Sequence, residues 1–460
     1  MATYTPFEKV HEFVLEKLQD SDVCIGKKGS YIKVFQSALH YKLNEMPSAK
    51  SGRNYFEFPA FLHWLYFLLL WLKTRGHSRI RLKQHVILDG GRFEENSGRS
   101  LFFDKLIQKL GKENITHLSR KIFTPKTYDY TLEEAERNFC FPSRFFFAQW
   151  RDSRLVYQKA KNSGRFDQEE LDYLAACLHS FVIRYGKTIA LYNNQQVKTV
   201  FFIVHYLNEG FISALHDLNV RCIELQHGLI SNADLYYVYD ERYRPYIQDA
   251  FFPDQLWVYG NLWRNRVLKG VEYVPGQVIV AGDYTHLFDK AINKPAQKEN
   301  LLVICTQKFL ADDYIPWIEK LQAHFTAHSD WSIIIKLHPR ERSADIERYL
   351  RFQSHQIQVE KGGNLDEIFS RAKIQLSIYS TTFYDAIGYG VTNFALIDAS
   401  NHASYIQEMI DTQVALPIRL NDDPISLSKK QVFNAVTRGD IYDSFPSPEI
   451  KTWIQKSVVQ

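Results

Sequence analysis

The sequence is poor in cysteine and lacks the local signatures of several enzyme classes. Five of its 460 residues are cysteine, and no two of them form a CxxC pair. An odd number of cysteines without paired spacing argues against a disulfide framework and favours a reducing cytoplasm. The sequence contains no Walker motif, no GxGxxG and no GxSxG elbow. The last of these absences argues against an α/β-hydrolase.

Metal-binding motifs are also missing. There is no HExxH, and no DxD follows a strand pattern in a convincing position. Asp312 and Asp313 follow a loop and are better explained as a helix cap. We therefore expect neither a metal nor a cofactor. The formal net charge is only +4, so the composition does not require nucleic acid as a partner.

The apolar runs of the sequence are too short to cross a membrane as a helix. The run that stands out, Ala60–Leu72, has about 13 residues, whereas a spanning helix needs about 20. A buried helix fits this run best. An interfacial helix is the alternative, supported by Trp64, Trp71 and the basic segment 73–83, and it would allow peripheral contact with the inner membrane. Because the N-terminus does not resemble a signal peptide, we expect a cytoplasmic protein.

Alternating strand and helix patterns run through the sequence and become regular near residue 197. Apolar runs that end at glycine or polar residues are typical of a parallel sheet, in which ligands bind beyond the carboxyl ends of the strands. Helices are expected near 5–19, 58–74 and 167–186, whereas 140–165 has no clear periodicity. The predicted strands are 85–88, 197–206, 221–225, 255–259, 277–280, 301–305, 332–336, 356–359, 374–378 and 393–397.

These patterns predict an α/β protein with two Rossmann-like domains. A chain of 460 residues is too long to fold around a single hydrophobic core of ordinary size, and its length suits two domains of roughly 150–250 residues each. The polar, proline-containing segment 294–300 is the predicted linker. It separates an N-terminal domain, 1–293, from a C-terminal domain, 301–435, and residues 436–460 are expected to form a helical tail.

Basic residues follow one apolar strand of the second domain. The run Ile333–Ile335 leads into Lys336, His338, Pro339 and Arg340. Because Pro339 ends the strand and stiffens the turn, we expect the basic side chains at the carboxyl edge of the sheet. Cations in that position suit a phosphate or a nucleotide. An ordinary basic loop with a capping histidine explains the same residues about as well.

Three hydroxyl side chains follow the strand that ends at Ile378. Ser380, Thr381 and Thr382 are expected at the start of a helix, where backbone N–H groups and the helix dipole bind anions. Simple capping, which needs only one hydroxyl, is the alternative. Asp385 lies about one turn further on and is a candidate for contacts with ribose hydroxyls. A surface acid that stabilises the helix dipole is the alternative for Asp385.

Two residues of the first domain are candidates for a catalytic base. His227 ends a strand and precedes Gly228, which would let a substrate approach the backbone closely. Asp89 also ends a strand and is followed by two glycines. A structural histidine and a simple glycine turn are the respective alternatives. Gly282 and Gln307 follow strands as well, and we expect them to line the donor pocket.

The order of three motifs resembles bacterial surface-polysaccharide glycosyltransferases of the GT-B fold. These motifs are QHG, KLHPR and YSTTFYDA, and they lie within about residues 197–400. The sequence is similar to sialyltransferases and Kdo transferases, which use CMP-sugars and carry a His-Pro motif and a later Ser-Ser/Thr motif. It is also similar to teichoic-acid polymerases of the CDP-glycerol glycerophosphotransferase type, except that Ile378-Tyr379 replaces their Asp-Tyr.

The resemblance implies two Rossmann-like domains that face a central cleft. It also implies that His338 contacts the nucleotide or its phosphate, that Ser380 and Thr381 bind phosphate, and that His227 is the candidate base. The acceptor would be a glycan or a lipid-linked glycan.

The predicted function is an inverting, metal-independent glycosyl transfer in the synthesis of lipopolysaccharide O antigen or capsule. The favoured activated donor is a CMP-sugar such as CMP-Kdo or CMP-sialic acid. Lys336, His338, Arg340 and the hydroxyl cluster would stabilise the leaving phosphate. The alternatives are transfer of a polyol phosphate from a CDP-polyol, pentosyl transfer from phosphoribosyl diphosphate, and a non-catalytic glycan-binding scaffold.

Overall fold

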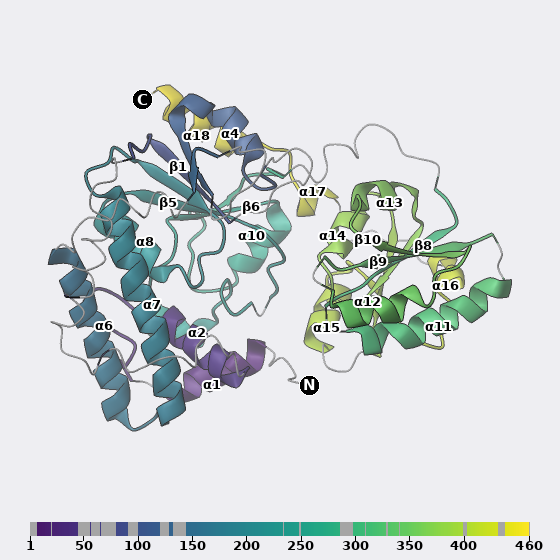
Figure 1. The fold of residues 1–460 in the computed structure, drawn as a ribbon, viewed down its shortest axis with the longest axis horizontal. Coiled ribbons are helices and arrows are strands. Elements are labelled where there is room, and N and C mark those ends of the chain that lie inside the picture. Colours follow the sequence, from purple (N-terminus) through teal and green to yellow (C-terminus); the bar gives the residue numbers. More distant parts are fainter. Residues whose placement is uncertain are drawn as a thin grey trace. The chain divides into compact units, whose positions relative to one another are not determined.

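The chain forms two α/β units, each built on a parallel sheet (Figure 1). Unit 1 comprises residues 1–285 and 444–460, and unit 2 comprises residues 286–443. The predicted pair of Rossmann-like domains is therefore confirmed, and the cleft between them stays a prediction. The computed structural model describes residues 7–19, 21–44, 56, 65, 80–90, 100–119, 128–131, 144–232, 234–247, 250–285, 298–308, 310–327, 330–339, 341–398, 403–430 and 438–459.

The sheet of unit 1 has seven strands in the order β3-β2-β1-β4-β5-β6-β7. All neighbouring strands are parallel. The chain adds β2 and β3 on one side of β1, and then β4 to β7 on its other side. The topological switch point therefore lies between β1 and β4. The strands are β1 (His85–Asp89), β2 (Ile115–Ser119), β3 (Tyr130–Thr131), β4 (Thr199–Phe202), β5 (Arg221–Leu225), β6 (Gln255–Val258) and β7 (Val278–Val280).

The sheet of unit 2 has six parallel strands in the order β10-β9-β8-β11-β12-β13, with its switch point between β8 and β11. The five strands predicted for this region are all present, with bounds that differ from the predicted ones by two residues at most. The strands are β8 (Leu301–Cys305), β9 (Ser332–Leu337), β10 (Ile357–Lys361), β11 (Ile374–Ser377), β12 (Thr392–Leu396) and β13 (Leu416–Ile418).

Helices cover both faces of the unit 2 sheet, with α11 and α12 on one side and α13 on the other (Figure 1). Leu301, Val303 and Cys305 of β8 pack with Ile368 and Phe369 of α13 in a buried cluster. Both faces of β8 are buried, which explains its uninterrupted apolar sequence. The helices are α11 (Ala311–Ala327), α12 (Ser343–Leu350), α13 (Leu365–Arg371), α14 (Thr382–Ile387), α15 (Ala403–Asp411), α16 (Pro424–Lys430) and α17 (Arg438–Ile441).

A helical layer formed by α1, α2, α6 and α7 lies on one side of unit 1 (Figure 1). The longest of these helices, α7, begins with a capping box, in which the Asp167 side chain and the Glu170 side chain each accept from the other's backbone N–H. The helices are α1 (Phe7–Leu18), α2 (Ile32–Leu43), α4 (Asp104–Leu110), α6 (Arg144–Ser163), α7 (Gln168–Tyr192), α8 (Glu209–Asp217), α9 (Arg244–Ile247), α10 (Asn261–Val267) and α18 (Pro448–Val459), with 3₁₀ turns η2 (Lys112–Asn114) and η3 (Glu241–Tyr243).

The C-terminal segment packs on unit 1 instead of forming a separate tail. The Trp453 ring of α18 contacts the rings of His85, Phe201 and Trp257, with centroids 5.9, 5.5 and 5.4 Å apart. The Ser447 N–H donates to the Ala281 carbonyl at 3.1 Å. Residues 444–460 therefore complete the core of the first unit, whereas the sequence suggested only a helical tail.

The described part of the predicted linker packs on unit 2. Lys298 Nζ donates to the carbonyls of Phe369 and Ala372, both at 2.8 Å. Residues 294–297 lie outside the described residues, as do Arg340 and most of the apolar run 60–72. Among the helices that are described, none combines the length and apolar character needed to cross a membrane.

Two buried histidines connect α1 and α2 to the rest of unit 1. His11 Nδ1 lies 2.9 Å from the Tyr243 hydroxyl, and His40 Nδ1 lies 3.0 Å from the Tyr236 hydroxyl. Burial lowers the pKa of His11 and of His40 to about 4 each, so both rings are neutral in the folded protein at pH 7.

The stability of unit 1 is expected to fall as the pH drops from about 6.5 to about 4. In that window the unfolded histidines bind protons that the folded ones do not, so the stability present above pH 6.5 is lost, by about 3 kcal/mol for each histidine. Urea unfolding at pH 7 and pH 4.5 measures the change. His40→Gln should show a weaker pH dependence, and His355→Gln, at an exposed position, should match the wild type. An unchanged dependence in His40→Gln would contradict the assignment.

Candidate functional site

At the unit 2 switch point, one amide side chain connects the loops after β8 and β11. Gln307 Oε1 accepts from the Tyr379 N–H at 3.1 Å, and Gln307 Nε2 donates to the Tyr379 carbonyl. The Tyr314 hydroxyl, fully buried on α11, donates to Gln307 Oε1 at 3.1 Å and accepts from the Ile378 N–H at 3.2 Å. Gln307 therefore fixes the backbone of the loop after β11, at the edge where ligands bind in open parallel sheets.

Lys336 lies near the carboxyl end of β9, at the same edge. Its side chain is 8% exposed, and Nζ is 3.8 Å from Glu360 Oε2. Nζ makes no hydrogen bond with any described residue. Burial lowers the pKa of the Lys336 amine, and the Glu360 carboxylate opposes this shift. Because Nζ is buried in this conformation, the Lys336 side chain would have to change its rotamer to donate to an anionic ligand.

The backbone at His338 is anchored through the neighbouring loop. The His338 N–H donates to Thr306 Oγ1 at 3.0 Å, and the Thr306 hydroxyl donates to Glu341 Oε2 at 2.9 Å. Burial raises the pKa of Glu341. The His338 side chain is half-buried, as a ligand contact requires. Lys336, His338 and Gln307 thus lie at one edge of one sheet, as predicted.

The hydroxyl cluster is organised mainly by internal hydrogen bonds. Ser380 Oγ accepts from the Thr382 N–H at 3.2 Å and from the Thr382 hydroxyl at 2.9 Å, and Gln375 Nε2 donates to Thr382 Oγ1 at 2.5 Å. Thr381 is exposed. The helix that follows, α14, has only six residues, so its dipole is weaker than the sequence pattern suggested. Capping, the alternative at the sequence level, accounts for Ser380.

Asp385 and Gly282 have structural partners of their own. Asp385 Oδ1 accepts from the Tyr442 hydroxyl at 2.8 Å. Gly282 belongs to unit 1 and has a φ of +94°, and a Cβ there would lie 2.4 Å from the Ser444 carbonyl oxygen. The close approach of the C-terminal segment therefore explains this glycine without a donor pocket.

In unit 1, the turn after β5 is fixed by the side chain of Gln226. Gln226 Oε1 accepts from the Tyr259 N–H at 3.1 Å, and Nε2 donates to the Gly228 carbonyl at 2.8 Å. His227 is half-buried, with its ring centroid 6.3 Å from that of Tyr206. The turn thus holds an accessible histidine at the carboxyl edge of the unit 1 sheet.

Glu224, three residues earlier, is fully buried and accepts three hydrogen bonds. The donors are the His205 N–H at 3.1 Å, His205 Nδ1 at 2.5 Å and the Tyr237 hydroxyl at 2.6 Å. Burial alone would raise the pKa of Glu224, but His205 and Tyr237 outweigh burial and lower it. Glu224 is therefore an ionised acceptor that stabilises the segments on either side of the His227 turn.

The backbone that delivers His205 to Glu224 is strained. Val204 has a φ of +68°, a left-handed conformation that β-branched residues rarely adopt. This conformation ends the strand at Phe202, earlier than the predicted 206. Strain of about 1–3 kcal/mol persists where surrounding contacts fix the backbone, and here the His205–Glu224 pair provides them.

Asp89 is fully buried at the end of β1. Its Oδ2 accepts from the Ser100 hydroxyl at 2.5 Å and lies 3.2 Å from His117 Nε2. A carboxylate with no exposed surface cannot meet an acceptor hydroxyl in this conformation. The environment favours a structural role for Asp89 and leaves His227 as the stronger candidate for a base.

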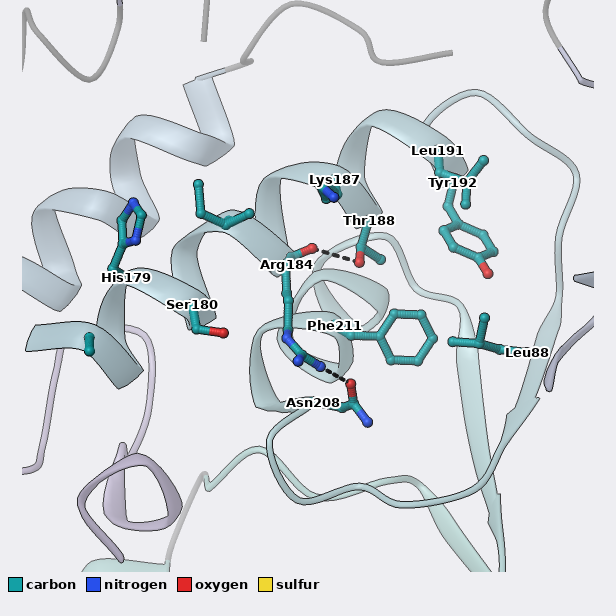
Figure 2. Close-up of a pocket in the computed structure, with 12 residues that line it drawn as sticks. Leu88, His179, Ser180, Arg184, Lys187, Thr188, Leu191, Tyr192, Asn208 and Phe211 are labelled. Atoms are coloured by element: carbon teal, nitrogen blue, oxygen red, sulfur yellow. Dashed lines mark hydrogen bonds between the residues drawn. The ribbon is translucent and has the colours of Figure 1, made fainter. Parts of the chain in front are cut away.

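A pocket of about 510 Å³ opens beside the unit 1 switch point, between α7, the start of α8 and the end of β1 (Figure 2). Figure 2 shows His179 and Ser180 at one end of the pocket and Leu88, Tyr192 and Phe211 at the other. Arg184, in the middle, donates to Asn208 Oδ1. The pocket therefore combines a basic, polar end with an aromatic one, a composition typical of small-molecule sites.

The comparisons with known proteins yield structural likenesses only. No protein-family model matches the sequence, and no curated protein matches it either. The chain is similar to UDP-GlcNAc 2-epimerase from Methanocaldococcus jannaschii, with a TM-score of 0.47 and 12% identity over 82% of this chain and 100% of that one. It is also similar to UDP-GlcNAc 2-epimerase from Neisseria meningitidis bound to UDP-GlcNAc, with a TM-score of 0.47 and 12% identity over 82% and 99% of the two chains.

A third likeness is to an alpha,alpha-trehalose-phosphate synthase (UDP-forming) from Burkholderia vietnamiensis. Its TM-score is 0.41, with 10% identity over 74% of this chain and 87% of that one. With TM-scores below 0.5, these likenesses carry no inference about activity.

Several residues that shape the two sheet edges have no signal in the sequence. Tyr314, His205 and Glu224 lie inside apolar or mixed patterns and become important only through contacts with distant residues. Arg184 lies on a helix face that reads as ordinary amphipathic sequence. The pair of Glu224, inside an apolar strand, and His205, after the preceding strand, is the one feature that a search for buried charges in the sequence could have found.

Proposed function

We propose that the protein is a glycosyltransferase of bacterial surface-polysaccharide synthesis, with its activated sugar donor bound at the carboxyl edge of the unit 2 sheet. The observation that supports this most directly is Lys336, an ammonium group near the carboxyl end of β9 that has no hydrogen-bond partner among the described residues. His338 follows β9 and the Ser380–Thr382 hydroxyls follow β11, the strands on either side of β8, so both lie at the same edge of the sheet. Together they would supply the positive charge and the N–H and O–H donors that a diphosphate or a monophosphate needs.

The proposed reaction is an inverting transfer that needs no metal at the donor phosphate. Charge develops on that phosphate as it leaves, and Lys336, His338 and Arg340 would stabilise it in a partly water-excluded crevice. His227 is the proposed base that removes the proton of the acceptor hydroxyl. A CMP-sugar is the favoured donor, because KLHPR and YSTTFYDA resemble the His-Pro and Ser-Ser/Thr motifs of the sialyltransferases and Kdo transferases, which use CMP-sugars.

The acceptor side of the proposal is the pocket between α7, α8 and β1. Its polar end, with His179 and Ser180, suits hydroxyl or acidic groups of a glycan. Arg184 is anchored by Asn208, so its guanidinium is held in place before a ligand arrives.

Nucleotide binding is the first test of this function. A thermal-shift screen with CMP, CDP, UDP and phosphoribosyl diphosphate should show the largest stabilisation with CMP. A preference for CDP would favour transfer of a polyol phosphate, and a preference for phosphoribosyl diphosphate would favour a pentosyltransferase. If none of the four raises the melting temperature, the proposed donor site is wrong and the glycan-binding scaffold is the better explanation.

Lys336→Met is expected to weaken binding of the selected nucleotide by roughly 10- to 150-fold. Removing one charged hydrogen-bond donor from a phosphate costs about 1.5–3 kcal/mol, and methionine keeps the length of the buried stem. Isothermal titration calorimetry measures the change. Lys373→Met is the matched control, because Lys373 is exposed at the opposite, amino edge of the same sheet and donates to Asn300 Oδ1 at 2.6 Å. Equal affinities for the two variants would contradict the site.

A further inference from the structure

Three side chains with metal-binding atoms meet at the amino edge of the unit 1 sheet. His216 lies in the last turn of α8, Cys222 is the second residue of β5, and Asp254 directly precedes β6. One atom from each lies within 4.8 Å of the other two. This edge is opposite to the one that carries His227 and the end of β1, so the cluster is separate from the proposed acceptor pocket and base.

The distances fit a tetrahedral metal ion. Zn–S and Zn–N bonds of about 2.3 and 2.0 Å at a tetrahedral angle place sulfur and nitrogen about 3.5 Å apart, and nitrogen and oxygen about 3.4 Å apart. His216 Nε2 is 3.5 Å from Cys222 Sγ and 3.6 Å from Asp254 Oδ1. A single weak hydrogen bond or ion pair would explain either distance alone, but an ion at the centre explains both from the same nitrogen.

A hydrogen bond to Asp254 Oδ2 orients the carboxylate so that its other oxygen, Oδ1, faces His216. Oδ2 accepts from the Cys222 N–H at 2.7 Å, and the Asp254 N–H donates to the Cys222 carbonyl at 2.9 Å. These bonds hold Oδ1 toward His216 and leave it available to a cation. Hydrogen bonds that orient metal ligands in this way are typical of built sites.

An ion can reach the cluster from solvent, because two of its three side chains are partly exposed. The side chains of His216 and Asp254 are 38% and 40% exposed, whereas Cys222 is buried. His216 also borders a hollow of about 480 Å³. Two lysines, Lys27 and Lys28, also line the hollow, and the charge of Lys28 is balanced by Asp217, whose carboxylate lies 2.6 Å from Lys28 Nζ.

We propose that His216, Cys222 and Asp254 bind one zinc ion that ties the end of α8 to β5 and β6. The combination of a thiolate, an imidazole and a carboxylate is one that Zn²⁺ prefers, and three protein ligands leave the fourth position to water. On binding, the Cys222 thiol releases its proton to solvent and the thiolate coordinates the ion. The three ligands form no sequence motif, so the site can be recognised only from the fold.

Metal titration of the whole chain tests the proposal. Protein stripped with a chelator and dialysed is titrated with Zn²⁺, and bound metal is measured by mass spectrometry. Co²⁺ then serves as a spectroscopic probe, because a cobalt–thiolate bond gives a charge-transfer band in the near ultraviolet. We expect about one zinc per chain, a higher melting temperature with zinc, and a cobalt–thiolate band.

The variants separate a metal site from a simple hydrogen-bonded cluster. Cys222→Ser should lose the cobalt–thiolate band, and His216→Gln, at a partly exposed position that tolerates substitution, should lose zinc binding with the fold intact by circular dichroism. Cys305→Ser, which changes a buried thiol of unit 2, should behave as the wild type. The proposal is overturned if the wild type binds no zinc, or if Cys222→Ser and His216→Gln bind it as tightly as the wild type does.

Discussion

Replacing Glu224 with alanine is expected to lower the free energy of unfolding of unit 1 by about 3–5 kcal/mol. The change removes the acceptor of three buried donors, two on His205 and one on Tyr237. The strained backbone at Val204 would also lose the contact that fixes it. Urea unfolding followed by tryptophan fluorescence measures the loss.

The control for this change is a glutamate on the surface. Glu241 pairs with Arg244 in an exposed ion pair, and such pairs contribute at most about 1 kcal/mol, so Glu241→Ala should have a small effect. The pH gives a second check. Because the pKa of Glu224 is lowered in the folded protein, its contribution is present above its unfolded pKa of about 4.3 and is lost as the pH falls below it. Glu224→Ala with wild-type stability at pH 7 would contradict the buried-ion description.

The second large effect is expected at His227. His227→Ala should reduce turnover by about 10²- to 10⁴-fold, the range typical of a lost general base, while nucleotide affinity stays unchanged. The side chain of Gln226 anchors the turn independently of His227, so the substitution should not disturb the backbone. Release of free nucleotide from the donor that the screen selects, in the presence of acceptor, gives the rate.

A matched substitution guards against a general effect of losing a histidine. His355 is exposed in unit 2, and His355→Ala should keep full activity. Adding a small diffusible base such as imidazole should restore part of the turnover of His227→Ala if the ring acts as a base. Unchanged turnover in His227→Ala would remove His227 from the mechanism and leave the base to be sought elsewhere in unit 1.

The sequence predicted the inner strands of the unit 2 sheet well because these strands are buried on both faces. Burial on both sides selects continuous apolar runs such as Leu301–Cys305, and these end sharply where the chain reaches the polar edge. Because Lys336, His338 and Gln307 follow or end such runs, the sequence places them at the carboxyl edge of the sheet. Strand ends can be read from sequence because the change in polarity is local.

In the helical layer of unit 1, α1 and α7 match the helices predicted near 5–19 and 167–186, whereas α2 and α6 were not predicted, and 140–165 had shown no clear periodicity. In α2, nine consecutive residues from Ile32 to His40 are buried, and they include polar ones. Lys33 donates to the Phe251 carbonyl at 3.1 Å, and Gln36 accepts from the Tyr239 hydroxyl at 2.6 Å. Polar residues that are satisfied by distant partners erase the amphipathic pattern, so a buried helix looks irregular in sequence.

The sequence indicated the strand-end residues of the candidate site, but not the buried residues that hold them in position. A local change in polarity marks the strand-end residues in the sequence. The roles of Tyr314, which positions Gln307, and of the buried Glu224 depend instead on contacts between residues distant in the sequence. The hydroxyl cluster was assigned to a helix dipole that a six-residue helix supplies only weakly. Such side-chain contacts span distances in sequence over which no local pattern exists.

The return of α18 to unit 1 has a consequence for how the protein is made. Trp453 packs against rings of β1, β4 and β6, and it is synthesised after the whole of unit 2. The core of unit 1 therefore cannot be completed until unit 2 and the segment that follows it have been synthesised. A chain stopped before residue 444 would leave that apolar surface uncovered, and its failure would be one of aggregation as much as of activity.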